Sequence, residues 1–423
     1  MTNIGIIASM KISVITLLLS TLFYFSSPKT AGDFMNYNEG NPQDDSLEVT
    51  SSFPIKMGTV SESYIAEKRH FIDSFYNKNI NSPFYSGAFI VVKNGRVLYE
   101  DYKGYANVKT GKKIDASTPI HLASVSKVLT AAAILRLVQQ DNITLDQKVT
   151  DWLPKFPYKQ ATIRILLNHR SGLPHYANFS GMMKKKWNRK KVLSNQDILN
   201  LLVQNKFRLR TPNDTHFDYC NTNYIILALI IEKATGLNYR QAMQELVFKP
   251  LGMTNTYVFN YETDRETASK SYRGSTIFPW DQFDALYGDK NIYSTARDLV
   301  KFDLGTYSAD FIKPALLQEA YFGYSAGHVA KPIKDYGLGM RMRFLPPTNE
   351  KMIYHNGWWH GNNTSFVPVK KDTVTVVCLG NKYSNRPYST LSMVSSLFYK
   401  KKTEIETPVP TEQELQELEL LGQ

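Results

Sequence analysis

The order of strand-like and helix-like segments along this chain restricts its fold more than any other feature of the sequence. Residues 88–92 and 97–99 are rich in apolar side chains and flank Asn94-Gly95, a dipeptide typical of hairpin turns. Strand-like segments return only beyond about residue 336, at residues 340–345, 351–354, 365–369 and 373–379. Strands at both ends with helices between them predict an α+β fold: one antiparallel sheet built from the two chain ends, flanked by helices, with an inserted and mostly helical lobe.

Helix ends are marked by capping residues and apolar periodicity. Ser194 and Thr295 are each followed three residues later by an aspartate, which is typical of a helix N-terminus. Apolar faces at 61–77 and 389–399 predict a first and a closing helix, the latter lying on the sheet.

Composition separates a globular part from two terminal segments. The chain has 423 residues, of which 43% are hydrophobic, enough for a sizeable core. We assign residues 60–402 to one folded domain with its helical lobe at about 121–335, residues 31–59 to a linker, and residues 403–423 to a polar tail. A cleft is expected at the seam between lobe and sheet.

The first 30 residues have the layout of an export signal. Lys11 precedes an uncharged apolar stretch, 12–27, that ends at Pro28. The stretch is short for a membrane-spanning helix and no clear Ala-X-Ala site follows it. Residues 1–30 are therefore either a signal peptide or an uncleaved membrane anchor, and we expect an exported protein that is periplasmic, secreted or membrane-anchored.

Charge and cysteine content exclude some functions. The formal net charge is +12, which favours contact with anionic envelope polymers or membrane faces. The basic residues are dispersed except at 184–191, which we interpret as a solvated loop, so no nucleic-acid partner is predicted. Cys220 and Cys378 are the two cysteines, and we expect free thiols rather than a disulfide scaffold.

Residues 123–135 carry the first catalytic pattern. The segment is rich in Ala and Leu and free of Gly and Pro, which predicts a buried helix. Ser124 and Lys127 are three apart and leave one face of that helix. A desolvated lysine has a lowered pKa and can take the proton of a serine hydroxyl. The pair is therefore a candidate nucleophile and base, although a serine at a helix start is also a common cap.

Two further motifs can contribute to one cleft. Tyr219 and Asn221 lie in a predicted loop before the apolar run 224–231, so a phenol and an amide can point the same way. His355 and Gly357 end a predicted strand, where a glycine lets a substrate approach the backbone and His355 can donate to its carboxylate or ester. Taken singly, these motifs are also explained by a structural tyrosine, a capping asparagine and a turn.

Together and in this order, the three motifs resemble the serine β-lactamase and penicillin-binding family, in the branch of class C β-lactamases, D-alanyl-D-alanine carboxypeptidases and related esterases. Ser124-Val125-Ser126-Lys127 is similar to S-x-x-K, Tyr219-Cys220-Asn221 to Y-x-N, and His355-Asn356-Gly357 to K/H-x-G. The resemblance spans about Ser86 to Leu379 and includes framework stretches at residues 94–97, 145–149, 165–174, 250–253 and 293–299.

The resemblance implies acyl transfer. Ser124 would attack a carbonyl, Lys127 and Tyr219 would share the proton transfers, and water would release the acyl group. Asn221 would hold Lys127 and the substrate amide. The backbone N–H groups of Ser124 and Trp358 would form the oxyanion hole.

The resemblance also implies which residues contact the substrate and whether a cofactor is required. His355 and Gly357 would line the substrate, and no cofactor or metal is needed; the eight histidines show no H-E-x-x-H spacing. A neutral imidazole anchors a carboxylate more weakly than lysine, so a strong β-lactamase is not expected. Trp358 and Trp359 either narrow the cleft or belong to the core.

We therefore predict a serine hydrolase acting on an ester or a D-amino-acid amide, with a small-molecule or peptide substrate that includes cell-wall fragments. The alternatives are a β-lactamase or penicillin-recognising D,D-peptidase, and a non-catalytic module that binds peptidoglycan or another ligand. A membrane tether through the N-terminal apolar segment stays an alternative to secretion.

Overall fold

The computed structural model describes residues 57–182, 188, 191–325 and 333–399. Every described residue belongs to one compact unit, which begins at or after Asp45. The predicted segment 1–30, the tail 403–423 and most of the linker 31–59 lie outside the described residues. No helix among the described residues has the length and hydropathy that a membrane span requires.

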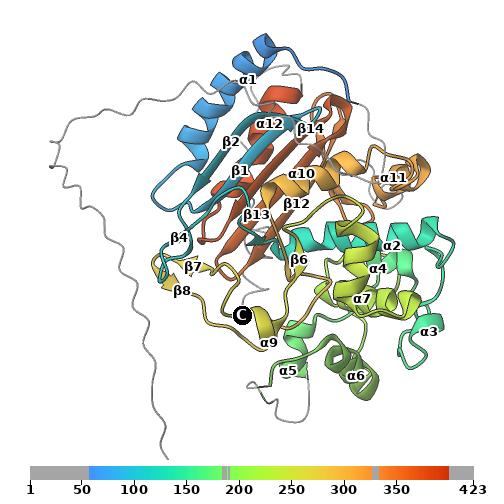
Figure 1. Cartoon of the computed structure of the whole chain (residues 1–423). Coiled ribbons are helices and arrows are strands. Elements are labelled where there is room, and N and C mark those ends of the chain that lie inside the picture. Colours follow the sequence, from blue (N-terminus) through green and yellow to red (C-terminus); the bar gives the residue numbers. More distant parts are fainter. Residues whose placement is uncertain (1–56, 183–187, 189–190, 326–332, 400–423) are drawn as a thin grey trace, which may run out of the picture. The chain divides into compact units, whose positions relative to one another are not determined.

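A seven-stranded antiparallel sheet built from both chain ends forms the centre of this unit (Figure 1). Its strand order is β10-β11-β12-β13-β14-β1-β2. The bounds are β1 Gly87–Lys93, β2 Arg96–Lys103, β10 Lys334–Tyr336, β11 Arg341–Leu345, β12 Glu350–Trp359, β13 Asn362–Val369 and β14 Val374–Gly380. The N-terminal β1 pairs with the C-terminal β14, with Phe89 opposite Cys378. The predicted α+β fold is confirmed.

The hairpin and the strand boundaries test the sequence patterns directly. Asn94 and Gly95 both have positive φ angles, 49° and 80°, as the predicted two-residue turn requires. The strand predicted at 351–354 was too short, because β12 continues through His355 to Trp359 by pairing with β13. The prediction ended the strand before Gly357, although this glycine lies inside β12.

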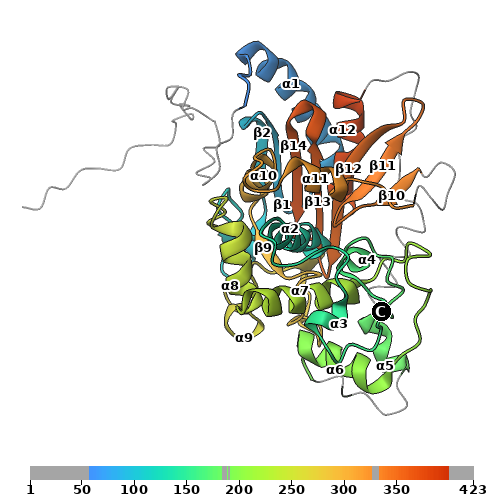
Figure 2. The same cartoon turned by 90° about the vertical axis from the view of Figure 1, so that its right-hand side faces the viewer.

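Helices cover both faces of the sheet (Figures 1 and 2). On one face, α1 (Glu62–Phe75) and α12 (Thr390–Phe398) share a core with the sheet, including Ile72, Val91 and Met393. On the other face, α10 (Ala296–Gly305) belongs to a second core with Ile90. The predicted first and closing helices are thus present, within two residues of their expected ends.

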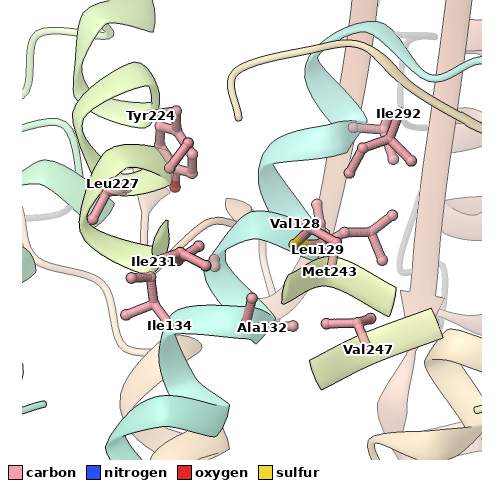
Figure 3. Packing of buried hydrophobic residues seen from close by; sticks show 14 of the residues in the cluster. Val128, Leu129, Ala132, Ile134, Tyr224, Leu227, Ile231, Met243, Val247 and Ile292 are labelled. Atoms are coloured by element: carbon pink, nitrogen blue, oxygen red, sulfur yellow. The ribbon is translucent and has the colours of Figure 1, made fainter. Parts of the chain in front are cut away.

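The helical region between the strands is held by apolar packing of α2 (Ser126–Gln139) against α7 (Asn221–Thr235). Figure 3 shows Ile134 from α2 beside Ile231 from α7. This core is continuous with the α10 face of the sheet, so α2 is fixed from both sides. Buried contacts on nearly every face explain why α2 contains no Gly or Pro.

The remaining elements complete this region. They are β3 Tyr105–Asn107, β4 Lys112–Lys113, β5 Ile120–His121, α3 Val149–Trp152, α4 Ile163–Leu167, α5 Phe179–Met182, α6 Asn195–Asn205, α8 Tyr239–Met243, β6 Tyr257–Val258, α9 Tyr261–Asp264, β7 Tyr272–Arg273, β8 Thr276–Ile277, β9 Ile292–Ser294 and α11 Pro314–Ala320. Ser194 and Asp197 form the expected capping box of α6, and Thr295 caps α10.

Candidate active site

Ser124 lies in a one-turn 3-10 helix, Ala123–Val125, that leads directly into α2. Ala123 has a φ of 48°, in the left-handed region that an L-residue with a Cβ seldom adopts. Its backbone N–H donates to Nδ1 of the buried His121 over 2.9 Å. The chain therefore bends sharply at the residue before Ser124, and His121 holds the bend.

Lys127 is fully buried in the first turn of α2. Its Nζ lies 2.9 Å from Ser124 Oγ and donates to the backbone carbonyl of Asp289, also over 2.9 Å. The structure thus brings the serine hydroxyl and the lysine amine into hydrogen-bond contact inside an apolar helix. A second acceptor fixes the position of the amine.

Tyr219 stands next to this pair. Lys127 Nζ lies 5.1 Å from the centroid of its ring. The Tyr219 hydroxyl is buried and, among the described residues, has no hydrogen-bond partner. Buried hydroxyls without a partner are uncommon and costly. The phenol is therefore available to a group that enters the cleft.

Asn221 begins α7, two residues after Tyr219. Its Oδ1 is buried and accepts no hydrogen bond from the described residues. The expected bond from Lys127 to this oxygen is therefore not formed, because Lys127 Nζ donates to Asp289 instead. Asn221 Oδ1 is therefore, like the Tyr219 hydroxyl, a buried polar atom without a partner among the described residues.

His355 lies on β12 and is fully buried. Burial, together with the nearby charges of Arg341 and Lys127, holds its pKa well below the ordinary value, so the imidazole is neutral. Nδ1 lies 2.7 Å from the Asn356 carbonyl and must carry the proton. Nε2 therefore accepts from the Tyr336 hydroxyl, 3.0 Å away. Donation from His355 to a substrate stays a prediction, and it would require the N–H to leave the Asn356 carbonyl.

Gly357 brings the strand against the nucleophile. A Cβ at this position would lie 3.0 Å from Ser124 N, 2.6 Å from Leu122 O and 2.3 Å from Thr364 Oγ1. Only glycine permits this approach. Trp358 follows on the strand, opposite Asn363, so the two backbone N–H groups expected to form an oxyanion hole belong to segments in direct contact.

Three residues of this site were not picked out individually from the sequence. Tyr336 is the partner of His355, the His169 ring lies 4.2 Å from the Tyr219 ring, and the Arg341 guanidinium lies 4.7 Å from it. His169 occurs within the framework stretch 165–174, which was an available signal. Arg341 is placed by its register opposite Tyr354, which no local pattern reveals.

A buried charged pair lies behind Lys127. The Asp289 carboxylate accepts from the Tyr176 hydroxyl over 2.8 Å and lies 3.5 Å from Lys290 Nζ. Lys290 Nζ also donates to that hydroxyl over 2.8 Å. Burial lowers the pKa of Lys290 even though a carboxylate is adjacent. Lys290 thus lies against the Asp289 carboxylate, whereas Lys127 is bonded to the backbone carbonyl of the same residue.

Among the described residues, one group could offer three ligand atoms to a metal ion: Asp281, Asp284 and His360, whose atoms lie within 4.8 Å of one another. Asp284 already accepts from Trp359 Nε1 over 2.7 Å, and its Oδ1 lies 2.9 Å from His360 Nε2. These hydrogen bonds give the cluster a structural role, which is to hold the end of β12.

The sheet, with the helix of Ser124 packed under its inner face, has the β-lactamase/transpeptidase fold, and the bonded serine and lysine place the chain among the serine hydrolases of that fold. Residues 81–393 match the Beta-lactamase family, and the chain belongs to it.

Individual relatives and solved structures are consistent with membership of this family. Penicillin-binding protein 4* of Bacillus subtilis is 30% identical over 320 residues, 72% of this chain and 70% of that protein. A D-aminopeptidase of Brucella anthropi is 29% identical over 220 residues, 51% of this chain and 41% of that protein. The crystal structure of a penicillin binding protein from Bacillus halodurans superposes with a TM-score of 0.65 at 22% identity, over 78% of this chain and 99% of that one. A D-stereospecific amidohydrolase from Streptomyces sp. superposes with a TM-score of 0.62 at 18% identity, over 79% and 99%.

Proposed function

We propose that this serine hydrolase forms an acyl-enzyme through Ser124 and cleaves an ester or a D-amino-acid amide. The observation that carries the proposal is the 2.9 Å contact between Ser124 Oγ and the fully buried Lys127 Nζ. The relatives named D-aminopeptidase and D-stereospecific amidohydrolase support this class of substrate. The substrate is a small molecule or a peptide, including cell-wall fragments.

Each proposed step uses a group already in place. As Ser124 Oγ attacks the carbonyl carbon, its proton passes to Lys127 Nζ, and the C–O bond of the acyl-enzyme forms. The oxyanion is held by the N–H groups of Ser124 and Trp358. The unpartnered Tyr219 hydroxyl gives its proton to the leaving nitrogen or oxygen and is reprotonated from Lys127. A water molecule then attacks the acyl carbon and gives a proton to Lys127 or Tyr219. The bond between the acyl carbon and Ser124 Oγ breaks, and the proton returns to Ser124 Oγ.

Asn221 and the β12 backbone would position the substrate. The free Asn221 Oδ1 suits an amide N–H of the substrate, and the glycine at 357 lets the substrate lie along the strand. His355, neutral and fully bonded, keeps Tyr336 in place.

One observation favours a second candidate, a penicillin-recognising D,D-peptidase. The Arg341 guanidinium lies beside Tyr219, where its positive charge favours the carboxylate of a peptide or β-lactam. The relative named penicillin-binding protein 4* supports this candidate. For either activity we propose an exported enzyme, secreted or tethered through residues 1–30.

Two covalent probes separate the candidates. The full chain is incubated with a fluorophosphonate and, separately, with a fluorescent penicillin, and the adducts are located by intact mass and peptide mapping. Labelling by the phosphonate alone supports the ester or D-amide hydrolase, and labelling by both supports the D,D-peptidase. A folded protein labelled by neither is a binding module.

Matched serine variants check the nucleophile. Ser124→Ala is expected to abolish every adduct. Ser126→Ala is the control, because this buried serine lies in the same motif but its Oγ accepts from Ile292 N over 3.2 Å. If Ser126→Ala lost the adduct while Ser124→Ala kept it, the assignment of the nucleophile would be wrong. Turnover of D- and L-phenylalanine amides then tests the stereochemical preference.

A further inference from the structure

We propose that a cavity beside Ser124 is the subsite for the acyl part of the substrate and that it selects acyl groups carrying an aromatic ring. The inference rests on the proposed function. The cavity has a volume of about 190 Å³. Its lining includes six rings, those of His121, Phe278, Trp280, Tyr293, Trp359 and His360.

The cavity lies on the same face of the sheet as the nucleophile. Side chains two apart on a strand share a face, so His355, Gly357 and Trp359 of β12 point the same way. Gly357 lies against Ser124 N, and Trp359 is one pleat, roughly 7 Å, further along. His121 borders the cavity from the other side, and its Nδ1 holds the N–H of Ala123 next to the nucleophile. Ser124 itself does not line the cavity, but two lining residues connect the cavity to it: Trp359 on the strand that packs against Ser124, and His121, which holds the turn before Ser124.

The position of Tyr219 decides which half of the substrate reaches the cavity. The group that protonates the leaving atom must lie within hydrogen-bond reach of it. Tyr219 lies toward His355, with 6.5 Å between their rings. Trp359 lies on the opposite side of Gly357 along β12. The leaving group therefore extends toward His355, and the acyl group extends toward Trp359 and the cavity.

The size and walls of the cavity fit a single aromatic ring. An apolar cavity of about 150 Å³ is known to accept benzene. Aromatic walls favour a ring through offset and edge contacts. Trp359 is fixed in place by its bond from Nε1 to Asp284 and by Lys290 Nζ, 4.4 Å above its ring. A bound ring would therefore meet a preorganised surface.

Two polar groups in the walls, those of Lys270 and His360, already have partners. Lys270 Nζ donates to the Arg265 carbonyl, and His360 Nε2 is bonded to Asp284. Insertion of an apolar ring would therefore leave no donor or acceptor of these two side chains without a hydrogen-bond partner. An aromatic acyl group is thus favoured over a charged one.

Paired substrates with one leaving group test the proposal. The rates of p-nitrophenyl acetate and p-nitrophenyl phenylacetate, and of the p-nitroanilides of D-alanine and D-phenylalanine, are compared in the full chain. In the wild type kcat/KM is expected to be about tenfold to 100-fold higher for the member of each pair with the ring.

Ser271→Phe fills the cavity from its wall without touching Ser124 or Lys127. It is expected to remove most of the preference for the ring by lowering kcat/KM for the phenylacetyl and D-phenylalanyl substrates. Ser63→Phe, at an exposed position of α1, is the matched control and should keep the preference. If Ser271→Phe fails to fold, Trp280→Ala, which removes a wall, should also reduce the preference.

Failure of the proposal differs from failure of the proposed function. A normal Ser124 adduct with equal rates for both members of each pair overturns the cavity assignment, as does a Ser271→Phe variant that slows both members equally. A folded protein that forms no adduct at Ser124 overturns the proposed function itself.

Discussion

Replacement of Gly357 by alanine should separate the geometry of the nucleophile from the stability of the sheet. The added Cβ would meet Leu122 O at 2.6 Å and Ser124 N at 3.0 Å, whereas ordinary van der Waals contact begins near 3.4 Å. Both atoms belong to backbone, so they cannot rotate away. The turn that carries Ser124 must therefore move away from β12.

The magnitude follows from that displacement. Overpacking of a buried site costs about 1–3 kcal/mol of unfolding free energy. A shift of the reacting group by about 1 Å costs on the order of 100-fold in rate. We therefore expect Gly357→Ala to lower the unfolding free energy modestly and the rate of phosphonate labelling at Ser124 by about 100-fold.

Urea denaturation and the rate of adduct formation, followed by intact mass, give the two quantities. Gly87→Ala is the matched control for stability, since its Cβ would lie 1.8 Å from Leu379 O in β14. It should destabilise the sheet at least as much while the folded fraction labels normally. Gly181→Ala, with no atom within 4 Å of its Cβ, should change neither quantity. Gly357→Ala protein that is folded and labels at the wild-type rate would refute the reasoning.

Three further predictions concern strain, acid and thiols. Ala123 has a left-handed φ of 48°, which glycine adopts without steric cost. Ala123→Gly should therefore raise the unfolding free energy by up to about 1 kcal/mol, reduced by the greater entropy of the unfolded chain. A lower urea midpoint would contradict this prediction. Burial lowers the pKa of His121 to about 4 and that of His355 well below its ordinary value, so the unfolded chain binds these protons first as the pH falls below about 6.5. The free energy of unfolding should therefore decrease as the pH falls from about 6.5 to 4. Each histidine contributes a loss of about 1.4 kcal/mol for every unit by which folding lowers its pKa. Equal urea midpoints at pH 6.5 and pH 4 would exclude this prediction. Burial raises the pKa of Cys220 to about 11 and that of Cys378 to about 12, so iodoacetamide at about pH 8 should modify neither in the native protein and both after unfolding, as mass spectrometry would show.

Local patterns predicted the elements that local interactions stabilise. The Asn94-Gly95 turn and the Ser194 cap depend on residues within three positions of one another, and both occur as expected. The helix of Lys127, α2, was equally readable from its apolar content, although Ser124 lies in the 3-10 turn just before it. The combination of both chain ends into one sheet followed from the order of these elements.

Sequence patterns gave wrong or incomplete predictions where pairing with a distant strand sets the length of a strand or the position of a side chain. β12 runs on to Trp359 because β13 pairs with it, although a glycine within the segment weakens the local strand preference. Arg341 reaches Tyr219 through its register in β11. Single-sequence periodicity contains no information on register.

The sequence by itself determined that a serine and a lysine leave one helix a single turn apart, because helix geometry fixes the spacing of side chains three residues apart. Only the tertiary structure decided how that pair is used. In the folded chain the Asp289 carbonyl is the second partner of Lys127, and His355 is a neutral hydrogen-bond acceptor. His121, Trp280 and Trp359 come together in the walls of an aromatic cavity. Desolvation and hydrogen bonding depend on atoms brought together from distant parts of the chain, so these properties arise only on folding.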